Sequence, residues 1–147
     1  MKIDDVNIGI IRELKQGKKS FQLIADKLDI TENTVRSRVN KMTEEGLLEI
    51  SGLVDPSSLP GHRMVIIGIN LSAMNLVPKG QEISKLKGVV SASVVTGRYD
   101  LIVQVLFNET FGLLEFYTDE IPKIQGIHNV ETFVVYKSYN LMVPYVL

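Results

Sequence analysis

Cysteine is absent from the 147-residue sequence, and histidine occurs only twice. Without cysteine the chain can form no disulfide framework, no thiolate metal site and no thiolate nucleophile, and we expect it to work in a reducing cytoplasm. Long apolar runs are also missing. Residues 64–78 carry no charge, but they are too few for a membrane span and polar side chains interrupt them. We therefore expect neither a membrane helix nor a signal peptide.

The chain has no excess of positive charge either, since its formal net charge is −1. With 45% apolar and 22% charged residues, it has the composition of an ordered globular protein. Its length allows one ordinary domain or two small ones. This composition excludes a low-complexity protein or a solvated tail.

Residues 20–46 predict two short helices joined by a tight turn. Ser20 can cap the first helix and Thr31 the second, with Ile30 and Val35 placed as a hydrophobic staple, and Gly46 ends the second helix. A small residue at the expected helix crossing and the very short turn favour a helix-turn-helix. The apolar stripes consist of Phe21, Ile24, Ala25 and Leu28 in the first helix and of Val35, Val39 and Met42 in the second.

The opposite side of the second helix carries side chains suited to reading DNA. Arg and Asn fit the edges of guanine and adenine in the major groove, while Ser, Thr and Lys hold phosphates. The alternative is a solvated surface, because polar residues lie opposite the apolar stripe of any surface helix. We predict double-stranded DNA as the partner, with Thr31, Asn33, Thr34, Arg36, Ser37, Arg38, Asn40 and Lys41 as the candidate contacts.

The charge of this region predicts a dimer. Residues 1–60 contain nine Lys or Arg against ten acidic residues, although residues 31–42 carry three basic side chains against Glu32 alone. The phosphate footprint of one subunit is therefore expected to be modest. Useful affinity then requires two such helices on one duplex, which means a homodimer.

Helix-capping, helix-ending and turn-forming residues in the rest of the sequence divide the chain into two domains. Asp4 is expected to cap a first helix, which Gly17 and the Lys18–Lys19 pair end. Leu47–Val54 predicts a strand, and Asp55–Gly61 concentrates Pro, Gly and Ser as a domain boundary does. We expect a helix-turn-helix domain over residues 1–48, a strand and linker over 49–61, and a second domain over 62–147.

The second domain predicts the order β-α-β-β-α-β, typical of an α+β ferredoxin-like sandwich. Two helices would cover one face of the sheet, and a second copy of the same sheet is the simplest cover for the other face. Alternation places Val103 and Val105 on the same face without saying which one. The expected strands span residues 63–72, 89–95, 100–107 and 130–137, and the expected helices span 78–86 and 110–121, the second closed by Pro122.

Four segments are distinctive: IDD at 3–5, LIADKLDIT at 23–31, VRSRV at 35–39 running to GLL at 46–48, and TGRYD at 96–100. Together they resemble the Lrp/AsnC family, also called feast/famine regulators. The resemblance implies a winged-helix-type DNA-binding domain joined by a strand linker to a ferredoxin-like ligand-sensing domain. It also implies dimers, often higher homo-oligomers, that respond to small molecules, commonly amino acids. Asp29 stands where the family's turn usually carries Gly, which Asp can replace in a left-handed conformation.

The hairpin loop of the second domain is the candidate effector site. As a plain connection it needs only a permissive Gly97, a packed Tyr99 and a turn-capping Asp100. As a site, its exposed amides can receive a carboxylate, Asp100 can accept hydrogen bonds from an α-ammonium group, and Tyr99 can wall the pocket. We predict an amino-acid effector bound at Thr96, Gly97, Arg98, Tyr99 and Asp100, with a neighbouring subunit completing the site.

Two other functions share parts of this pattern. Siroheme decarboxylases resemble the same two-domain plan, but His62 and His128 lie far apart in sequence, and adjacent carboxylates on a helix point to different faces. A ligand-sensing module without DNA binding is the other alternative. We expect no catalytic residues, no metal site and no cofactor, and a transcriptional regulator rather than an enzyme.

Overall fold

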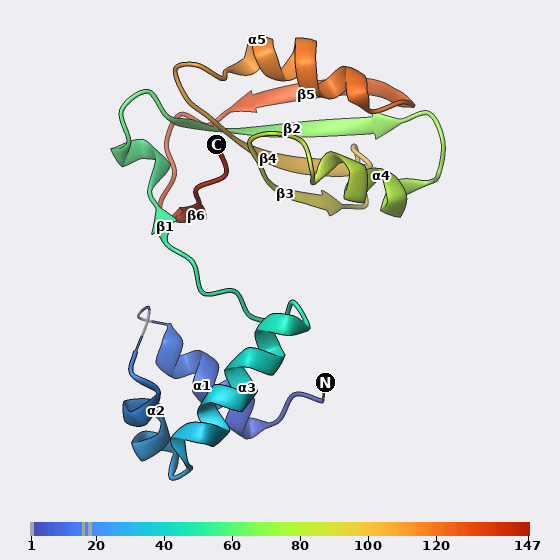
Figure 1. Ribbon diagram of the computed structural model, residues 1–147. Helices are drawn as coiled ribbons and strands as arrows, with labels where there is room; N and C mark the ends of the chain where they lie inside the picture. The colour runs from blue at the N-terminus through green and yellow to red at the C-terminus, as the bar shows by residue number, and fades with distance from the viewer. Residues whose placement is uncertain (1, 16, 18) are drawn as a thin grey trace. The chain divides into compact units, whose positions relative to one another are not determined.

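The computed structural model describes residues 2–15, 17 and 19–147, so the predicted role of Lys18 lies outside the described residues. The chain forms two compact units, and the boundary between them along the sequence lies between Ser51 and Gly52 (Figure 1). Each unit has its own apolar core. Among the described residues, no helix is both long and apolar enough to cross a membrane.

Three helices form the first unit: α1 (Asp5–Leu14), α2 (Phe21–Leu28) and α3 (Glu32–Glu44). Two predicted caps are confirmed, since the side chain of Asp4 accepts from the Asn7 N–H at 3.0 Å and that of Thr31 from the Thr34 N–H at 3.2 Å. Ser20 stands at the N-cap position of α2, as predicted, but its side chain makes no capping hydrogen bond.

The turn between α2 and α3 is short because Asp29 adopts the left-handed conformation, with φ of 53°. This lets the Ile30 N–H reach back to the carbonyl of Ala25 at 3.1 Å. The predicted apolar stripes of both helices are confirmed as one core. Its buried members are Ile10, Ile24, Ala25, Val35, Val39 and Met42.

The strand predicted over Leu47–Val54 is wrong for all but its last two residues. Only β1 (Leu53–Val54) is a strand, paired with β6 (Val143–Pro144) near the end of the chain. Residues 47–52 have no strand partner, and branched side chains alone do not make a strand. The unit boundary therefore falls before Asp55–Gly61. That segment belongs to the second unit and begins with the short 3₁₀ turn η1 (Pro56–Ser58), capped by Asp55.

The second unit has the predicted ferredoxin-like order. Its four-stranded antiparallel sheet runs β3-β4-β2-β5 in space, so the first strand of the domain is central. The helices lie on one face of this sheet, and β1, β6 and the C-terminal tail lie on the other (Figure 1). The elements are β2 (Arg63–Leu71), α4 (Leu76–Ile83), β3 (Val89–Val94), β4 (Leu101–Phe107), α5 (Leu113–Glu115) and β5 (Ile127–Val134).

The second helix of this unit is not the continuous helix predicted over residues 110–121. α5 passes into a π-helical turn, η2 (Phe116–Glu120), and then into the 3₁₀ turn η3 (Ile121–Lys123). Two local groups explain the change. Pro122 has no N–H to donate to an α-helical carbonyl, and the Thr118 hydroxyl donates to the Leu114 carbonyl at 3.0 Å.

The two sheet faces are covered differently. Val103 and Val105 face the helices and are fully buried, so they are core residues and not part of the open face. On that other face, Met64 and Leu106 pack against Val143 of the tail. At this end of the sheet the chain therefore covers the face itself, whereas a second copy was the simplest cover expected from the sequence.

Candidate DNA-binding and effector sites

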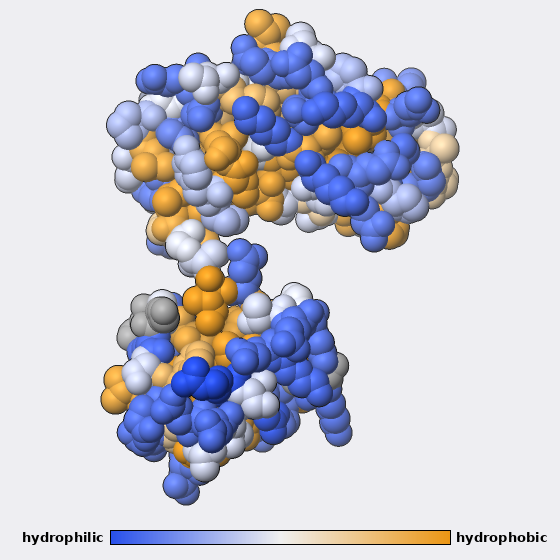
Figure 2. Space-filling view, in the orientation of Figure 1, coloured by the Kyte–Doolittle hydropathy of each residue, from blue (hydrophilic) through white to orange (hydrophobic). Residues whose placement is uncertain are grey.

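The outward side of α3 forms a shallow, exposed and mainly polar surface. Arg36 extends from it with its guanidinium 2.6 Å from Glu32 and 5.3 Å from the centre of the Phe21 ring. The side of the first unit that Figure 2 shows, over α3, is largely hydrophilic. The candidate residues gathered here are Asn33, Arg36, Ser37, Asn40 and Lys41, and the acidic Glu44 and Glu45 border them.

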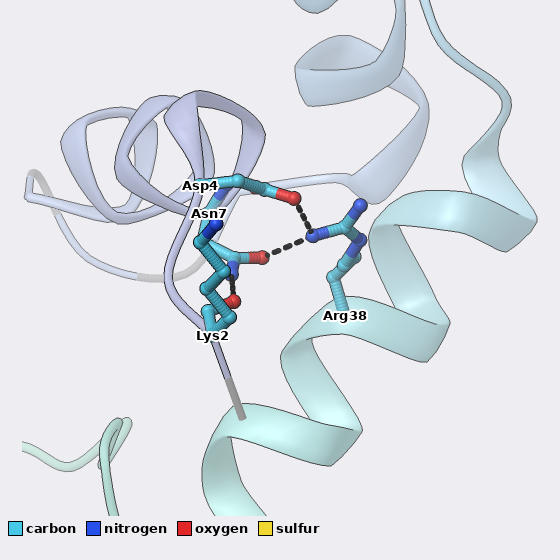
Figure 3. Close-up of polar contacts among 4 residues, drawn as sticks. All are labelled: Lys2, Asp4, Asn7 and Arg38. Atoms are coloured by element: carbon cyan, nitrogen blue, oxygen red, sulfur yellow. Dashed lines mark hydrogen bonds and ion pairs between the residues drawn. The ribbon is translucent and has the colours of Figure 1, made fainter.

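Besides Arg36, which pairs with Glu32, three of the proposed contacts have partners within the first unit. Thr31 and Thr34 cap the start of α3 and join their hydroxyls at 2.9 Å. Arg38 points away from the exposed surface toward α1 (Figure 3), donating to Asp4 Oδ2 at 2.5 Å and Asn7 Oδ1 at 2.9 Å. Its hydrogen bond holds the pKa of the Asp4 carboxyl below its usual range. The structure thus separates Arg38 from the other candidates and places it in the contact that fixes α3 on α1.

A second ion pair joins α1 to α2. Glu13 Oε2 accepts from Lys27 Nζ at 2.8 Å and from Lys19 Nζ at 3.1 Å. These two lysines, Lys27 first, lower the pKa of the Glu13 carboxyl. The Arg38–Asp4 pair and the apolar core hold α3 on α1 and α2, and the two pairs of Glu13 support the packing of α2, so α3 has the fixed orientation that a helix inserted into a groove requires.

The candidate effector loop is tied to the end of β2. Asn70 Nδ2 donates to the Arg98 carbonyl at 2.8 Å, and the Leu71 N–H donates to Asp100 Oδ2 at 2.8 Å. The Asp100 N–H donates in turn to the Ile69 carbonyl at 3.0 Å. Gly97 takes a φ of +129°, which favours glycine, and Thr96 is exposed beside it. One oxygen of Asp100 therefore already holds the backbone of β2.

Tyr99 lies against Gly68, on the sheet face opposite the helices. A Cβ at Gly68 would come within 2.7 Å of the Tyr99 ring, so only glycine leaves room for it. The Tyr99 hydroxyl donates to Glu131, which raises the pKa of the phenol, and Arg98 lies 3.0 Å from the same carboxylate. Phe133 meets Tyr99 edge to face, with ring centres 6.0 Å apart.

Sequence reasoning missed four residues of this cluster: Gly68, Asn70, Glu131 and Phe133. Gly68 interrupts an otherwise apolar strand, a pattern that indicates close approach of another group. This pattern could have identified Gly68 from the sequence alone. Glu131 and Phe133 lie some 30 residues from the loop, and only the pairing of β5 with β2 brings them there. No local pattern indicates them.

The two histidines do not form a site together. His62 Nδ1 lies 2.7 Å from the Pro60 carbonyl and Nε2 lies 3.3 Å from the Tyr145 hydroxyl, while His128 is exposed on β5. Across the described part of the chain, no group of three or more His, Cys, Asp or Glu residues could hold a metal ion.

Family models match both units separately. Residues 3–49 match the model described as winged helix-turn-helix DNA-binding, and residues 64–143 match the model described as Lrp/AsnC ligand binding domain. The chain belongs to the Lrp/AsnC family. The predicted family and fold class are thereby confirmed.

Curated relatives of this Lrp/AsnC chain are regulators. It is 28% identical over 137 residues to an uncharacterised HTH-type transcriptional regulator of Pyrococcus abyssi, which covers 92% of this chain and 87% of that protein. It is 24% identical over 139 residues to the HTH-type transcriptional regulator Ptr1 of Methanocaldococcus jannaschii, covering 93% and 94%. The Lrp/AsnC chain is accordingly a DNA-binding transcriptional regulator with a ligand-binding domain. This favours the regulator over the enzyme alternative.

Solved structures share the fold over nearly the whole chain. AsnC of E. coli superposes with a TM-score of 0.70 at 23% identity, covering 96% of this chain and 97% of that one. A transcriptional regulator of Neisseria meningitidis, solved as a complex with L-Met, superposes with a TM-score of 0.71 at 17% identity, covering 99% and 96%. At these identities the likeness concerns the fold.

Proposed function

We propose that this Lrp/AsnC regulator reads its promoter with the exposed side of α3, as a homodimer, and that an amino acid bound at the β3–β4 loop modulates its assembly or DNA binding. The observation that carries the proposal is the division of α3 into two sides. One side is buried and clamped to α1 and α2, while the other presents Arg36, Asn40 and Lys41 to the outside.

Substitutions on the exposed side of α3 test the DNA contact. Arg36→Ala and Asn40→Ala should each cost about 1–3 kcal/mol of binding at a selected site and relax its sequence preference. Lys41→Ala should weaken all sequences alike and reduce the salt slope by about one. Arg12→Ala, which removes an exposed arginine from α1, is the matched control. Mobility-shift titrations at several salt concentrations measure both effects, and parent-like binding by all three variants would contradict the proposal.

The dimer is proposed through the sheet face that lacks helices. The tail covers one end of this face, but Phe133 keeps 41% exposure, and Ile66 and Ile102 are only half-buried. A second copy would cover these side chains and bring two α3 helices to half-sites one or more helical turns apart. Phe133→Asp should dissociate the dimer in sedimentation equilibrium. Val94→Asp, an equally exposed residue on the helix side of β3, should not; an unchanged Phe133→Asp dimer argues against this face.

The effector is proposed at Thr96–Asp100. Support comes from the loop's position beside the half-buried Tyr99 and Glu131 and, for the class of ligand, from the L-Met complex of the Neisseria structure. A thermal-shift screen of the twenty amino acids is the first test, since a ligand at a hundred times its Kd adds about 2.7 kcal/mol to the folded state. Asp100→Asn removes the carboxylate charge while an oxygen remains for the Leu71 N–H. It should abolish the response, and unchanged affinity in calorimetry would leave the loop a structural connection.

We also propose that the protein has no enzymatic activity and acts in the cytoplasm. The relatives are named as regulators, which supports the first point. The ring nitrogens of His62 also lie within hydrogen-bond distance of the Pro60 carbonyl and the Tyr145 hydroxyl, which is a structural role for this side chain. The second point follows from the DNA it binds. Turnover of a tetrapyrrole by the purified protein would move the assignment to the decarboxylase alternative.

A further inference from the structure

A separate pocket of about 430 Å³ opens in the ligand-binding unit at the end of the sheet where β2 begins and β5 ends. In Figure 1 the connection from β4 to α5 curves past this end of the sheet. The pocket lies on the helix side of the sheet, because Val65 and Phe107, both core residues of that side, form its floor. Its volume falls within the range of small-molecule sites.

The floor of this pocket stays open because α5 begins too late to cover it. Val134 pairs with Val65 across β2 and β5 and so belongs to the helix side, yet it is 59% exposed. Leu113, the first residue of α5, is also exposed at the opposite wall. An apolar side chain of a ligand would find three apolar contacts here, from Val65, Val134 and Leu113.

Two side chains of opposite charge line the same pocket. Arg63 pairs with Phe107 in the sheet register, so its side chain leaves the strand on the pocket side. Glu109 folds across Gly61, where a Cβ would come within 2.7 Å of Glu109 Oε1, and Gly61 has a φ of +69°. Among the described residues, neither Arg63 nor Glu109 has a side-chain hydrogen bond or ion pair, with each other or with any neighbour.

This combination complements one class of small molecule. A guanidinium receives a carboxylate through two parallel hydrogen bonds, and a carboxylate receives an ammonium group. We propose that the pocket binds a free α-amino acid with an apolar side chain, its carboxylate on Arg63, its ammonium on Glu109 and its side chain on Val65 and Val134.

The pocket is a second site, distinct from the loop at Thr96–Asp100. Arg63 stands at the first residue of β2, whereas Asn70 and Leu71, which hold the loop, stand at its other end. Seven residues of extended strand separate them by roughly 23 Å at about 3.3 Å per residue, so no amino acid reaches both. The inference therefore goes beyond the proposed function and does not rest on it.

Calorimetry on the full chain with L-leucine, L-methionine and L-phenylalanine tests the pocket. For L-leucine, N-acetylation removes the ammonium charge and amidation removes the carboxylate, so each analogue should bind about tenfold or more weakly. Glu109→Gln should weaken L-leucine by a similar factor and leave N-acetyl-L-leucine nearly unchanged. Arg63→Met should likewise weaken L-leucine and spare L-leucinamide. Lys85→Met and Glu49→Gln, at exposed positions outside the pocket, are the matched controls and should bind like the parent.

A readout on the parent protein needs no variant. The methyl resonances of Leu113 and Val134 should shift on addition of L-leucine. If Asp100→Asn abolishes all binding while Arg63→Met and Glu109→Gln bind normally, the pocket is overturned and the loop site stands. The reverse pattern supports the pocket and removes the loop site. If none of the three amino acids binds, the pocket proposal fails.

Discussion

Arg38→Met separates two roles that the residue type alone leaves open. The sequence pattern makes Arg38 a DNA contact, whereas the structure places its guanidinium between Asp4 and Asn7 of the α1 start (Figure 3). Methionine retains an unbranched stem of similar length but has no donor. The two roles predict opposite outcomes, a loss of stability in one case and a loss of DNA affinity in the other.

The expected loss of stability rests on the bond to Asn7, whose side chain is fully buried. A hydrogen bond from a charged donor contributes about 1.5–3 kcal/mol. We therefore expect Arg38→Met to destabilise the first unit by about 2 kcal/mol, a change of roughly thirtyfold in its unfolding equilibrium at 1.4 kcal/mol per factor of ten. The capping bond from the Asn7 N–H to Asp4 is kept, so α1 should still begin at the same residue.

Hydrogen exchange of the α3 amides is the suitable assay, because the two units have separate cores and need not unfold together. Protection of Val35 and Val39 should fall in Arg38→Met, while affinity for a selected DNA site, measured where the unit is folded, stays within about threefold of the parent. Arg36→Met is the control with the opposite expected result: amide protection of α3 should stay normal and DNA binding should weaken. Normal protection in Arg38→Met together with a tenfold loss of site affinity would refute the positioning role.

Three further substitutions or conditions have defined outcomes. The lowered pKa values of Asp4 and Glu13 mean that their contribution to stability is present above the ordinary carboxyl pKa of about 4 and is lost as pH falls through the lowered values, so α3 amide protection should decline on acidification below pH ~4. Gly68→Ala should displace the Tyr99 ring and destabilise the second unit by about 1–3 kcal/mol in urea unfolding. Asp29→Gly should stabilise the first unit by up to about 1 kcal/mol in the same assay, because Asp29 has a φ of 53° that glycine adopts more readily.

Sequence reasoning succeeded where short-range chemistry decides the structure. Thr31 and Asp4 cap their helices because a side-chain oxygen reaches an N–H three residues later, a contact that needs no other part of the chain. The apolar periodicity of α2 and α3 likewise identified the buried stripe without knowledge of its partner. The order of strands and helices in the second unit followed from the same kind of signal.

Sequence reasoning failed where a contact with a residue far away in the sequence decides the structure. Residues 47–52 have the composition of a strand, but a strand needs a neighbour, and only Leu53 and Val54 find one, about 90 residues further along the chain. Arg38 shows the same limit within a site. Helical geometry gives the direction of its side chain. Its acceptors, however, lie 31 and 34 residues earlier, at the start of α1. The pattern of α3 does not show how α1 packs against it.

Alternation along a strand shows which residues share a sheet face, but it does not show which face the helices cover. A period of two placed Val103 and Val105 on one face, and the structure keeps them together, fully buried under the helices. Which face this was depended on where α4 and the residues after β4 return to the sheet, which is a property of the whole domain. A charge at Val103 would therefore unfold the domain and reveal nothing of assembly. Phe133, on the other face and partly exposed, is the position where a charge tests the proposed dimer without disturbing the core.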